Sequence, residues 1–303
     1  MRPEYREEPC KTALNRVAGG MHFAWSLNPY MGCVHRCTFC YVRGFERRAE
    51  RPSGDAYGTS IRVKTNLVEV LRSEVGRRSW KREHVAIGAA TDPYQPAEGT
   101  YRLTRGAIEV LGQARTPLSI ITRGPLIVRD ADVLQAASAR AEVGVSFSIP
   151  TLDEDVWRTT EPGTAPPRQR LRALEQLVKA GVRAGVSIAP VIPGLSDGDE
   201  QIEEVVRAAR DSGAVSLWCN VLHLKPGTKE HFLEHLARDW PEVVEGVGGM
   251  YAGTYAPPDY QSSVQATADA LVARYGIADR RSRPIEPAPA ARQLGLFDLA
   301  GAR

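Results

Sequence analysis

Three of the chain's five cysteines lie within eight residues of one another, and together they could hold a metal centre. Cys33, Cys37 and Cys40 follow the spacing C-x3-C-x2-C. Thiolates are soft ligands that suit iron–sulfur clusters, and a 4Fe–4S cluster that is fully held by protein takes four of them. Three cysteines in one short loop therefore predict a 4Fe–4S cluster with one iron left open.

An open iron of this kind can chelate the amino and carboxylate groups of S-adenosyl-L-methionine (SAM). One electron from the reduced cluster then cleaves the sulfonium and releases a 5′-deoxyadenosyl radical, chemistry that the cofactors carry while the protein positions them. Two alternatives stay open. His35 lies inside the motif and could complete a zinc site of three cysteines and one histidine, or the cysteines could be buried structural residues.

The composition describes a globular chain of 303 residues, with 43% hydrophobic and 25% charged residues, which favours one main domain. An odd number of cysteines suits a metal site in a reducing compartment better than a disulfide framework. No apolar run reaches the roughly 20 residues that span a bilayer, and the first residues lack the apolar core of a signal peptide. We therefore expect a cytoplasmic protein with no membrane partner. The net charge of +3 permits nucleic-acid binding without arguing for it.

Short β-rich runs alternate with amphipathic helical stretches between about residues 25 and 221. Strands spaced by helices indicate parallel βα units, and six units are too few for a closed eight-unit barrel. The sequence predicts an α/β fold, a partial, open (β/α)6 barrel whose function lies at the carboxyl ends of the strands. The expected strands are 24–27, 85–90, 118–122, 143–149, 184–189 and 215–221. The expected helices are 67–75, 104–114, 131–139, 168–180 and 199–211. Asn66 with Glu69 resembles a helix cap, and Gly181 a helix stop.

We divide the chain into four parts. Residues 1–22 form an N-terminal extension, and residues 23–223 form the core. Residues 224–276, with helices near 230–237 and 264–275, form a helical extension that caps the barrel. Residues 277–303 are rich in Pro, Ala and Arg and read as a disordered linker and tail.

Several further segments lie in order at the predicted strand ends. With the cysteine loop, they resemble the radical SAM superfamily, and within it the branch that contains spore photoproduct lyase. The resemblance covers roughly residues 26–221 and rests on Asn28-Pro29-Tyr30, Thr91-Asp92-Pro93-Tyr94-Gln95-Pro96, Thr122-Arg123, Phe147-Ser148-Ile149, Glu161-Pro162-Gly163-Thr164 with Arg170, and Ala189-Pro190-Val191-Ile192-Pro193-Gly194.

The resemblance implies which residues contact SAM: Tyr41, Thr91, Asp92, Arg123, Ser148, Arg170, Val191 and Ile192. Thr91 and Asp92 lie in the segment that meets the SAM amine, and Arg170 approaches its carboxylate. Simpler roles stay open for each position. The segment at Thr91 could be only a turn, Ser148 a strand end, and Arg170 a solvated helix residue.

One departure from the family bears on catalysis. Spore photoproduct lyase has a hydrogen-donating cysteine just before its Ser/Thr-Asp segment, and this chain has Gly88-Ala89-Ala90 there. We therefore do not expect repair of the spore thymine dimer by the same donor path. The candidate catalytic residues are Tyr41, Tyr94 and Cys219. Cys219 could also be a small buried hydrophobic residue.

Two features bear on partners. Basic residues follow the cysteine loop and fit phosphates, an acidic electron donor such as ferredoxin or flavodoxin, or simply solvent: Arg43, Arg47, Arg48, Arg51, Arg62 and Lys64. The tail peptide Gln293-Leu294-Gly295-Leu296-Phe297 resembles peptides that dock on the bacterial sliding clamp, with residues 280–292 as a tether. A tail that packs on its own core is the alternative.

Aromatic residues of the helical extension could stack on a base flipped out of DNA, although core packing is their commoner role: Trp240, Tyr251, Tyr255 and Tyr260. The sequence thus predicts a radical SAM enzyme of the spore photoproduct lyase-like group that acts on nucleic acid, in DNA repair or modification. One alternative is a radical SAM enzyme acting on a small molecule, a peptide or tRNA. The other is a non-catalytic metal-binding accessory protein of the replisome.

Overall fold

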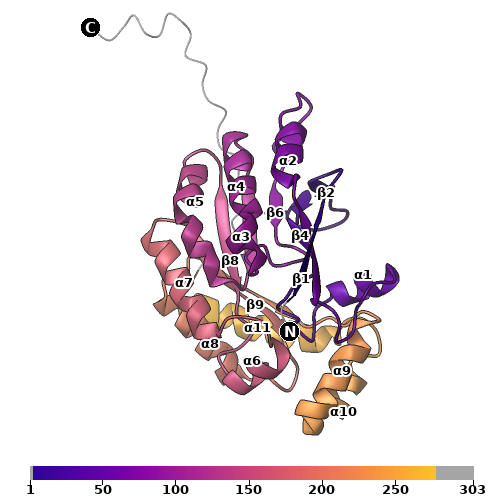
Figure 1. Ribbon diagram of the computed structural model, residues 1–303. Coiled ribbons are helices and arrows are strands. Elements are labelled where there is room, and N and C mark those ends of the chain that lie inside the picture. Colours follow the sequence, from indigo (N-terminus) through magenta and orange to yellow (C-terminus); the bar gives the residue numbers. More distant parts are fainter. Residues whose placement is uncertain (1–2, 278–303) are drawn as a thin grey trace, which may run out of the picture.

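A curved sheet of seven strands forms the centre of the molecule (Figure 1). The structure is a computed structural model, and it describes residues 3–277. The strand order is β10-β9-β8-β7-β6-β3-β2. The strands are β2 (Leu14–Arg16), β3 (Trp25–Leu27), β6 (Val85–Ile87), β7 (Leu118–Thr122), β8 (Val143–Ser148), β9 (Ala184–Val191) and β10 (Leu217–Val221).

The sheet is an open barrel. Only β2 runs antiparallel to its neighbour, and the other six strands are parallel. Because the order is linear, β10 and β2 are the two edges and the sheet does not close. The predicted partial, open (β/α)6 barrel is confirmed, with β2 as an additional antiparallel edge strand.

Helices between the strands cover one face of the sheet (Figure 1). The helix α7 buries Leu171, Leu174 and Leu177, which recur every three residues and so share one side of the helix. Gly181 follows this helix with a φ of +76°, the left-handed conformation expected of a helix stop. The helices in this part of the chain are α2 (Leu67–Val75), α3 (Ala97–Tyr101), α4 (Leu103–Gln113), α5 (Ala131–Ser138), α6 (Glu154–Thr160), α7 (Pro167–Lys179) and α8 (Asp199–Asp211), with a 3-10 helix, η1 (Pro125–Asp130).

The first 65 residues depart most from the prediction. A second sheet of order β1-β5-β4 joins β1 (Glu4–Glu8), β5 (Ser60–Lys64) and β4 (Tyr30–Met31), and α1 (Val42–Arg48) follows the cysteine loop. A boundary at residue 23 would divide β2 from its partner β3. The side chain of Asn66 does not cap α2; it binds the backbone N–H and carbonyl of Cys10, at 2.7 and 3.1 Å. Neither β1, which is exposed throughout, nor β2, with three residues, carries an apolar alternation that a sequence could reveal.

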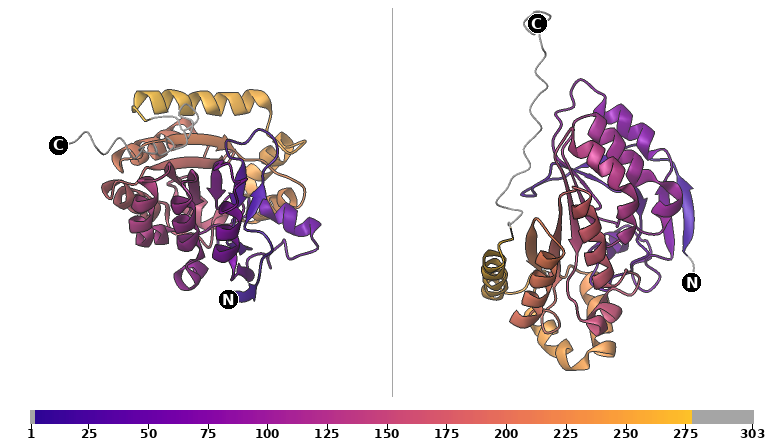
Figure 2. Two further views of the ribbon diagram at one scale, coloured as in Figure 1. Left: turned by 90° about the horizontal axis from the view of Figure 1, so that it is seen from above. Right: turned by 90° about the vertical axis from the view of Figure 1, so that its left-hand side faces the viewer.

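The helical extension comprises α9 (Thr228–Asp239), α10 (Pro241–Met250) and α11 (Pro258–Arg274). The helix α11 packs on β10 and α8, and Figure 2 shows it alongside the β10 edge of the sheet. It therefore protects an edge strand from pairing with other chains. The helices α9 and α10 lie at the end of the barrel near α1, which α9 contacts. In the range 3–277, no helix is both long and apolar enough to cross a membrane.

Candidate active site

The three cysteines lie between β4 and α1. Cys33 and Cys37 are buried, Cys40 is half-buried, and none of them forms a disulfide. Among the described residues, the cysteine sulfurs and the His35 nitrogens do not provide three ligand atoms within 4.8 Å of one another. A tetrahedral zinc ion holds its ligands closer than this, about 3.8 Å apart for Zn–S bonds of about 2.3 Å. In a cluster, each cysteine binds a different iron, so the sulfurs lie further apart. The donor set therefore fits an iron–sulfur cluster better than a single zinc ion.

Two glycines let other segments approach the backbone of the cysteine loop. A Cβ at Gly58, whose φ is +78°, would lie 2.3 Å from the carbonyl oxygen of Cys33. A Cβ at Gly163 would lie 2.2 Å from the carbonyl oxygen of Val34. Only glycine fits at such distances. The loop is thus held between residues that lie far from it in the sequence.

Arg43 holds the cysteine loop from inside the protein. Its side chain is buried and its guanidinium donates to four backbone carbonyls, those of Cys37, Arg36, Ser53 and Gly54, at 2.8–3.1 Å. The central carbon of the guanidinium, Cζ, lies 4.8 Å from the centre of the Tyr57 ring. The sequence places Arg43 among arginines expected at the surface, and this prediction is wrong because its guanidinium binds carbonyls inside the protein.

The segment 91–96, which follows β6, binds the backbone at the start of the cysteine loop. The Gln95 side chain is fully buried; it donates to the carbonyl of Gly32 and accepts from the N–H of Val34, both at 3.2 Å. Thr91 donates through its hydroxyl to the carbonyl of Tyr30 at 2.7 Å. Asn28 accepts from the N–H of Thr91 at 3.2 Å. Gln95 lies within a segment that the sequence singled out, but its role as a loop anchor was missed, since glutamine is common on surfaces.

Asp92 lies at the centre of a buried polar network. One carboxylate oxygen accepts from the Thr122 hydroxyl at 2.7 Å and from the N–H of Tyr94 at 2.8 Å. The other accepts from the N–H of Arg123 at 2.6 Å and lies 3.4 Å from Nδ1 of His35. Burial alone would raise the pKa of Asp92, but His35 and these hydrogen bonds outweigh it and lower the pKa to about 2. Asp92 is therefore ionised, and it fixes the ends of β6 and β7 relative to the cysteine loop.

Two arginines share the buried carboxylate of Glu161. Arg123 donates to one oxygen at 2.5 Å, and Arg170 lies 2.9 Å from the other. Arg170 is fully buried and also donates to the carbonyl of Ser148 at 2.8 Å, at the end of β8. The simpler expectation of a solvated Arg170 is wrong. Its assignment as a SAM contact stays a prediction, since its donors in this structure bind protein atoms.

The inner face of the sheet carries a row of polar groups. Adjacent residues in register point to the same face, so Ser148, Ser187 and Trp218 share it. Ser119 and Ser146 lie on this face too, because Ser119 pairs with Gly144, two residues before Ser146. Within the described part of the chain, three of these groups are buried without a hydrogen-bond partner: the hydroxyls of Ser119 and Ser146 and the indole nitrogen of Trp218. Val191 and Ile192 are fully buried at the end of β9. In register, Trp218, Ser146 and Ser119 lie four, six and eight residues before Val191 along β9, so these polar groups line the interior of the barrel below its carboxyl end.

The three candidate catalytic residues lie apart. Tyr41 follows Cys40 directly, and its hydroxyl donates to the carbonyl of Ala89. Tyr94 is buried, with its hydroxyl near Asp130. Cys219 pairs with Ile188 and so points to the face opposite Ser148, toward the helices. Only Tyr41 lies beside the cysteines, and the hydrogen-donor roles of Tyr94 and Cys219 have no geometric support here.

A row of three rings, which the sequence did not reveal, leads from the cysteine loop to the surface. The Tyr41 ring centre lies 5.7 Å from that of His223, which lies 6.0 Å from that of Tyr255. Tyr255 is 63% exposed. His223 follows β10, and Tyr255 lies between α10 and α11. The sequence singles out Tyr41 and Tyr255 separately, Tyr255 as one of the four aromatic residues named above for the extension, but nothing in it indicates that His223 joins them.

Comparison with known proteins agrees with this arrangement. Residues 27–209 match the family described as the Radical SAM superfamily. An uncharacterised protein of Mycobacterium tuberculosis is 37% identical over 286 residues, which is 93% of this chain and 84% of that protein. A Pseudomonas phage protein named radical SAM Nalpha-GlyT isomerase is 26% identical over 176 residues, 57% of this chain and 34% of that protein.

The fold has a solved counterpart. Spore photoproduct lyase complexed with dinucleoside spore photoproduct superposes with a TM-score of 0.69 over 89% of this chain and 79% of that chain, at 16% identity. This likeness concerns the fold, while the family follows from the match over most of the core. The chain is an enzyme that belongs to the radical SAM superfamily.

Proposed function

We propose that Cys33, Cys37 and Cys40 hold a 4Fe–4S cluster with an open iron for SAM, and that the enzyme acts on nucleic acid. When bound, the cluster supplies the electron that cleaves SAM reductively. Among the described residues, the cysteine sulfurs and the His35 nitrogens do not converge to the spacing that one zinc ion needs, and this supports the cluster. The fold neighbour is a lyase in complex with a dinucleoside, which supports a substrate of the same class.

The chain's own residues would then orient SAM. Val191 and Ile192, which are buried at the carboxyl end of β9, offer an apolar wall for its adenine. The side chains of Thr91 and Asp92 bind the protein itself, so we assign them a positioning role that presents their backbone to the SAM amine. The roles of Arg123, Ser148, Arg170 and Tyr41 as SAM contacts stay part of the same proposal.

The ring row is the observation that favours nucleic acid over another substrate. Tyr41, His223 and Tyr255 offer successive ring faces from the residue beside Cys40 to an exposed tyrosine. Aromatic side chains stack on unpaired bases, each contributing about 1–3 kcal/mol. A base flipped out of a duplex, or one in a single strand, could follow this row toward the cysteine loop.

Cationic groups beside the row suit a phosphate backbone. Phe45 is 39% exposed, and the charged groups of Arg48 and Lys225 lie 4.8 and 5.3 Å from the centre of its ring. Phosphate contacts of this kind make affinity fall as salt concentration rises. The same positive surface would also suit an acidic electron donor, ferredoxin or flavodoxin.

The test uses the anaerobically reconstituted enzyme with dithionite. We expect single-stranded DNA to raise 5′-deoxyadenosine formation several-fold, and DNA binding to weaken steeply with salt. If SAM is cleaved but DNA neither binds nor changes the rate, the nucleic-acid substrate is wrong while the cluster assignment stands. If no SAM is cleaved and the cysteines hold zinc, the cluster assignment is wrong.

The predicted clamp-binding peptide, residues 293–297, lies outside the described residues. Its docking on a sliding clamp stays a sequence-based prediction. Binding of the full chain to a purified bacterial clamp, compared with a chain lacking these five residues, would test it.

A further inference from the structure

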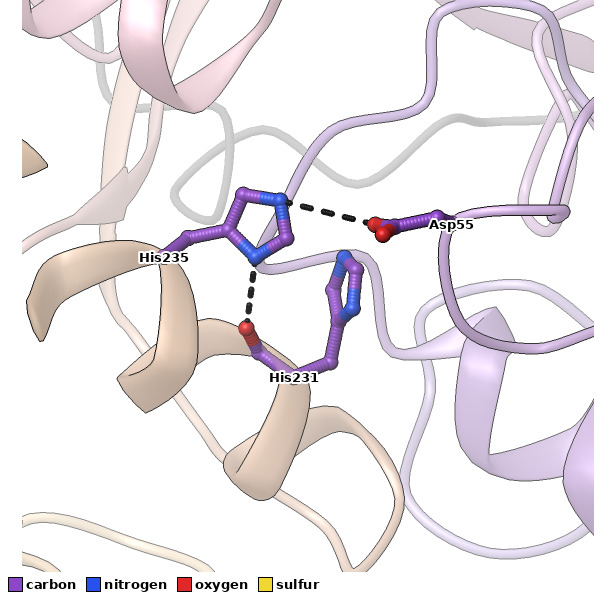
Figure 3. Close-up of side chains that lie close together, drawn as sticks. All are labelled: Asp55, His231 and His235. Carbon is purple, nitrogen blue, oxygen red and sulfur yellow. Dashed lines mark hydrogen bonds and ion pairs between the residues drawn. The ribbon is translucent and has the colours of Figure 1, made fainter. Parts of the chain in front are cut away.

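A second group of side chains of the types that bind metals lies apart from the three cysteines. His231 and His235 of α9 face Asp55, which belongs to the loop 49–59 between α1 and β5 (Figure 3). One ligand atom from each residue lies within 4.8 Å of the other two. This is the one group of three such residues with this spacing between residues 3 and 277. The side chains come from parts of the chain about 175 residues apart, so the fold alone brings them together.

The two histidines are arranged as ligands rather than as a hydrogen-bonded pair. They are four residues apart on one helix and therefore share a face. Nδ1 of His235 lies 2.8 Å from the carbonyl oxygen of His231, so it donates there and leaves Nε2 with a lone pair. That Nε2 lies 3.8 Å from a carboxylate oxygen of Asp55. A carbonyl that binds one imidazole nitrogen and fixes the other for a metal is a common outer partner in metal sites.

His231 supplies the observation that points to a ligand. Its side chain is only 7% exposed, and its Nε2 is buried without a hydrogen-bond partner in the described structure. A buried polar atom without a partner costs free energy, so its presence needs an explanation. The rings of His231 and His235 have centres 4.2 Å apart, and both lie beside Asp55 (Figure 3). A bound cation would satisfy both nitrogens and the carboxylate.

The surroundings decide what completes the site. The group opens on a cavity of about 390 Å³ whose lining includes Arg36, Arg43 and Arg238. Arg43 is occupied by backbone carbonyls, Arg36 donates to the Asp55 carbonyl at 2.6 Å, and Arg238 pairs with Asp239 at 2.7 Å. The three positive guanidinium groups disfavour a cation with no negative ligand besides Asp55, and they favour an anion as the fourth ligand. Two neutral imidazoles and one carboxylate leave a divalent ion with one net positive charge and an open position toward the cavity.

We propose that His231, His235 and Asp55 bind a divalent ion of the zinc class, separate from the cluster. Imidazole and carboxylate suit zinc, and three protein ligands with an open fourth position are typical of reactive zinc sites. The ion would join α9 to the loop that carries Ser53 and Gly54, whose carbonyls hold Arg43. It would therefore connect the helical extension to the backbone of Cys37 through one arginine.

The experiment measures zinc on the anaerobically reconstituted enzyme. We expect one zinc per chain in addition to the cluster iron. Zinc-edge X-ray absorption should show nitrogen and oxygen ligands at about 2.0–2.2 Å and no sulfur at about 2.3 Å. Zinc titration against a chelator should give an affinity that falls by at least about tenfold in His235→Ala and in Asp55→Asn, since even an outer partner's loss has this effect.

Glu234→Ala, an exposed change on the same helix, should leave zinc affinity unchanged. The Asp55 side chain is 86% exposed, so Asp55→Asn keeps the test valid if a histidine variant fails to fold. A sulfur shell around the zinc, or unchanged affinity in both ligand variants, would overturn the proposal. So would binding of inorganic phosphate in the cavity by a protein that takes up no zinc, because the arginines would then define an anion site.

Discussion

The guanidinium of Arg43 donates to the carbonyl oxygen of Cys37, six residues earlier, at 3.1 Å. The arginine comes from α1 and reaches back beneath the loop that precedes this helix. Its four hydrogen bonds end on carbonyls of the cysteine loop, those of Arg36 and Cys37, and of the loop after α1, those of Ser53 and Gly54. A loop has few backbone hydrogen bonds of its own, so one buried guanidinium can determine its shape. The positions of the cysteine sulfurs therefore depend on a residue that is not a ligand.

Replacing Arg43 with lysine should impair cluster binding. Lysine keeps the charge but has a single ammonium group, so it cannot reach four carbonyls arranged around a planar fork. Each buried carbonyl left without a donor costs about 1–3 kcal/mol. We expect Arg43→Lys to lower both the iron content per chain and the free energy of unfolding in urea. Arg48→Lys, at an exposed position of the same helix, is the matched control. Equal iron content in the two variants would contradict the role of Arg43.

The cysteines themselves should differ in their importance. Cys37→Ala leaves two thiolates, too few to hold the cluster, so cluster absorbance and 5′-deoxyadenosine formation should both be lost. Cys10→Ala changes a half-buried cysteine outside the loop and should retain both. Cys219→Ala should retain them too, because Cys219 faces the helices. Loss of SAM cleavage in Cys219→Ala with the cluster intact would restore it as a catalytic candidate.

The sequence predicted those parts of the molecule that short-range patterns control. The six parallel strands and the five longer helices between them follow from apolar periodicity, and Gly181 from its need for a positive φ, whereas the short helices α3, α6 and η1 were not predicted. Arg43 was misjudged because nothing in a run of arginines shows which one is buried. The ring row could not be predicted either, since His223 and Tyr255 meet Tyr41 only after β10 and the helical extension are in place. Asn66 binds Cys10, 56 residues away, a contact that competes with helix capping and has no local signal.

The carboxylate of Glu161 should be critical for stability. It is 1% exposed and neutralises both Arg123 and Arg170, so Glu161→Gln leaves two arginines without their counter-charge. Removing one partner of a buried ion pair costs about 3–5 kcal/mol. We expect the free energy of unfolding of Glu161→Gln, measured in urea, to be lower than that of the wild type by this amount. Arg168→Ala breaks an exposed pair with Glu204 and should change the stability by about 0–1 kcal/mol.

The pH dependence of unfolding gives this test a second readout. Burial alone would raise the pKa of Glu161, but Arg170 and Arg123 outweigh it and hold the pKa below its usual value. A carboxyl whose pKa is lower in the folded state stabilises the fold at pH values above its unfolded pKa of about 4.3. This stabilisation is lost as the pH falls through the folded pKa. The difference in the free energy of unfolding between the wild type and Glu161→Gln should therefore shrink as the pH falls below about 4. A constant difference would mean that the glutamine acts through packing.

Tyr255 offers the sharpest test of a nucleic-acid substrate, because its ring is exposed and its loss should not affect folding. If a base stacks on it, Tyr255→Ala should weaken single-stranded DNA binding by about 1–3 kcal/mol, or roughly 5- to 150-fold in Kd. Phe23→Ala removes a ring that packs on His84 just before β3 and β6, at the opposite end of the parallel strands, and should leave the Kd unchanged. SAM cleavage without DNA should be equal in the two variants, since neither ring contacts the cysteine loop. Equal DNA affinity in both variants would remove the ring row as a binding surface, and the substrate would then have to be sought among molecules that need no stacking.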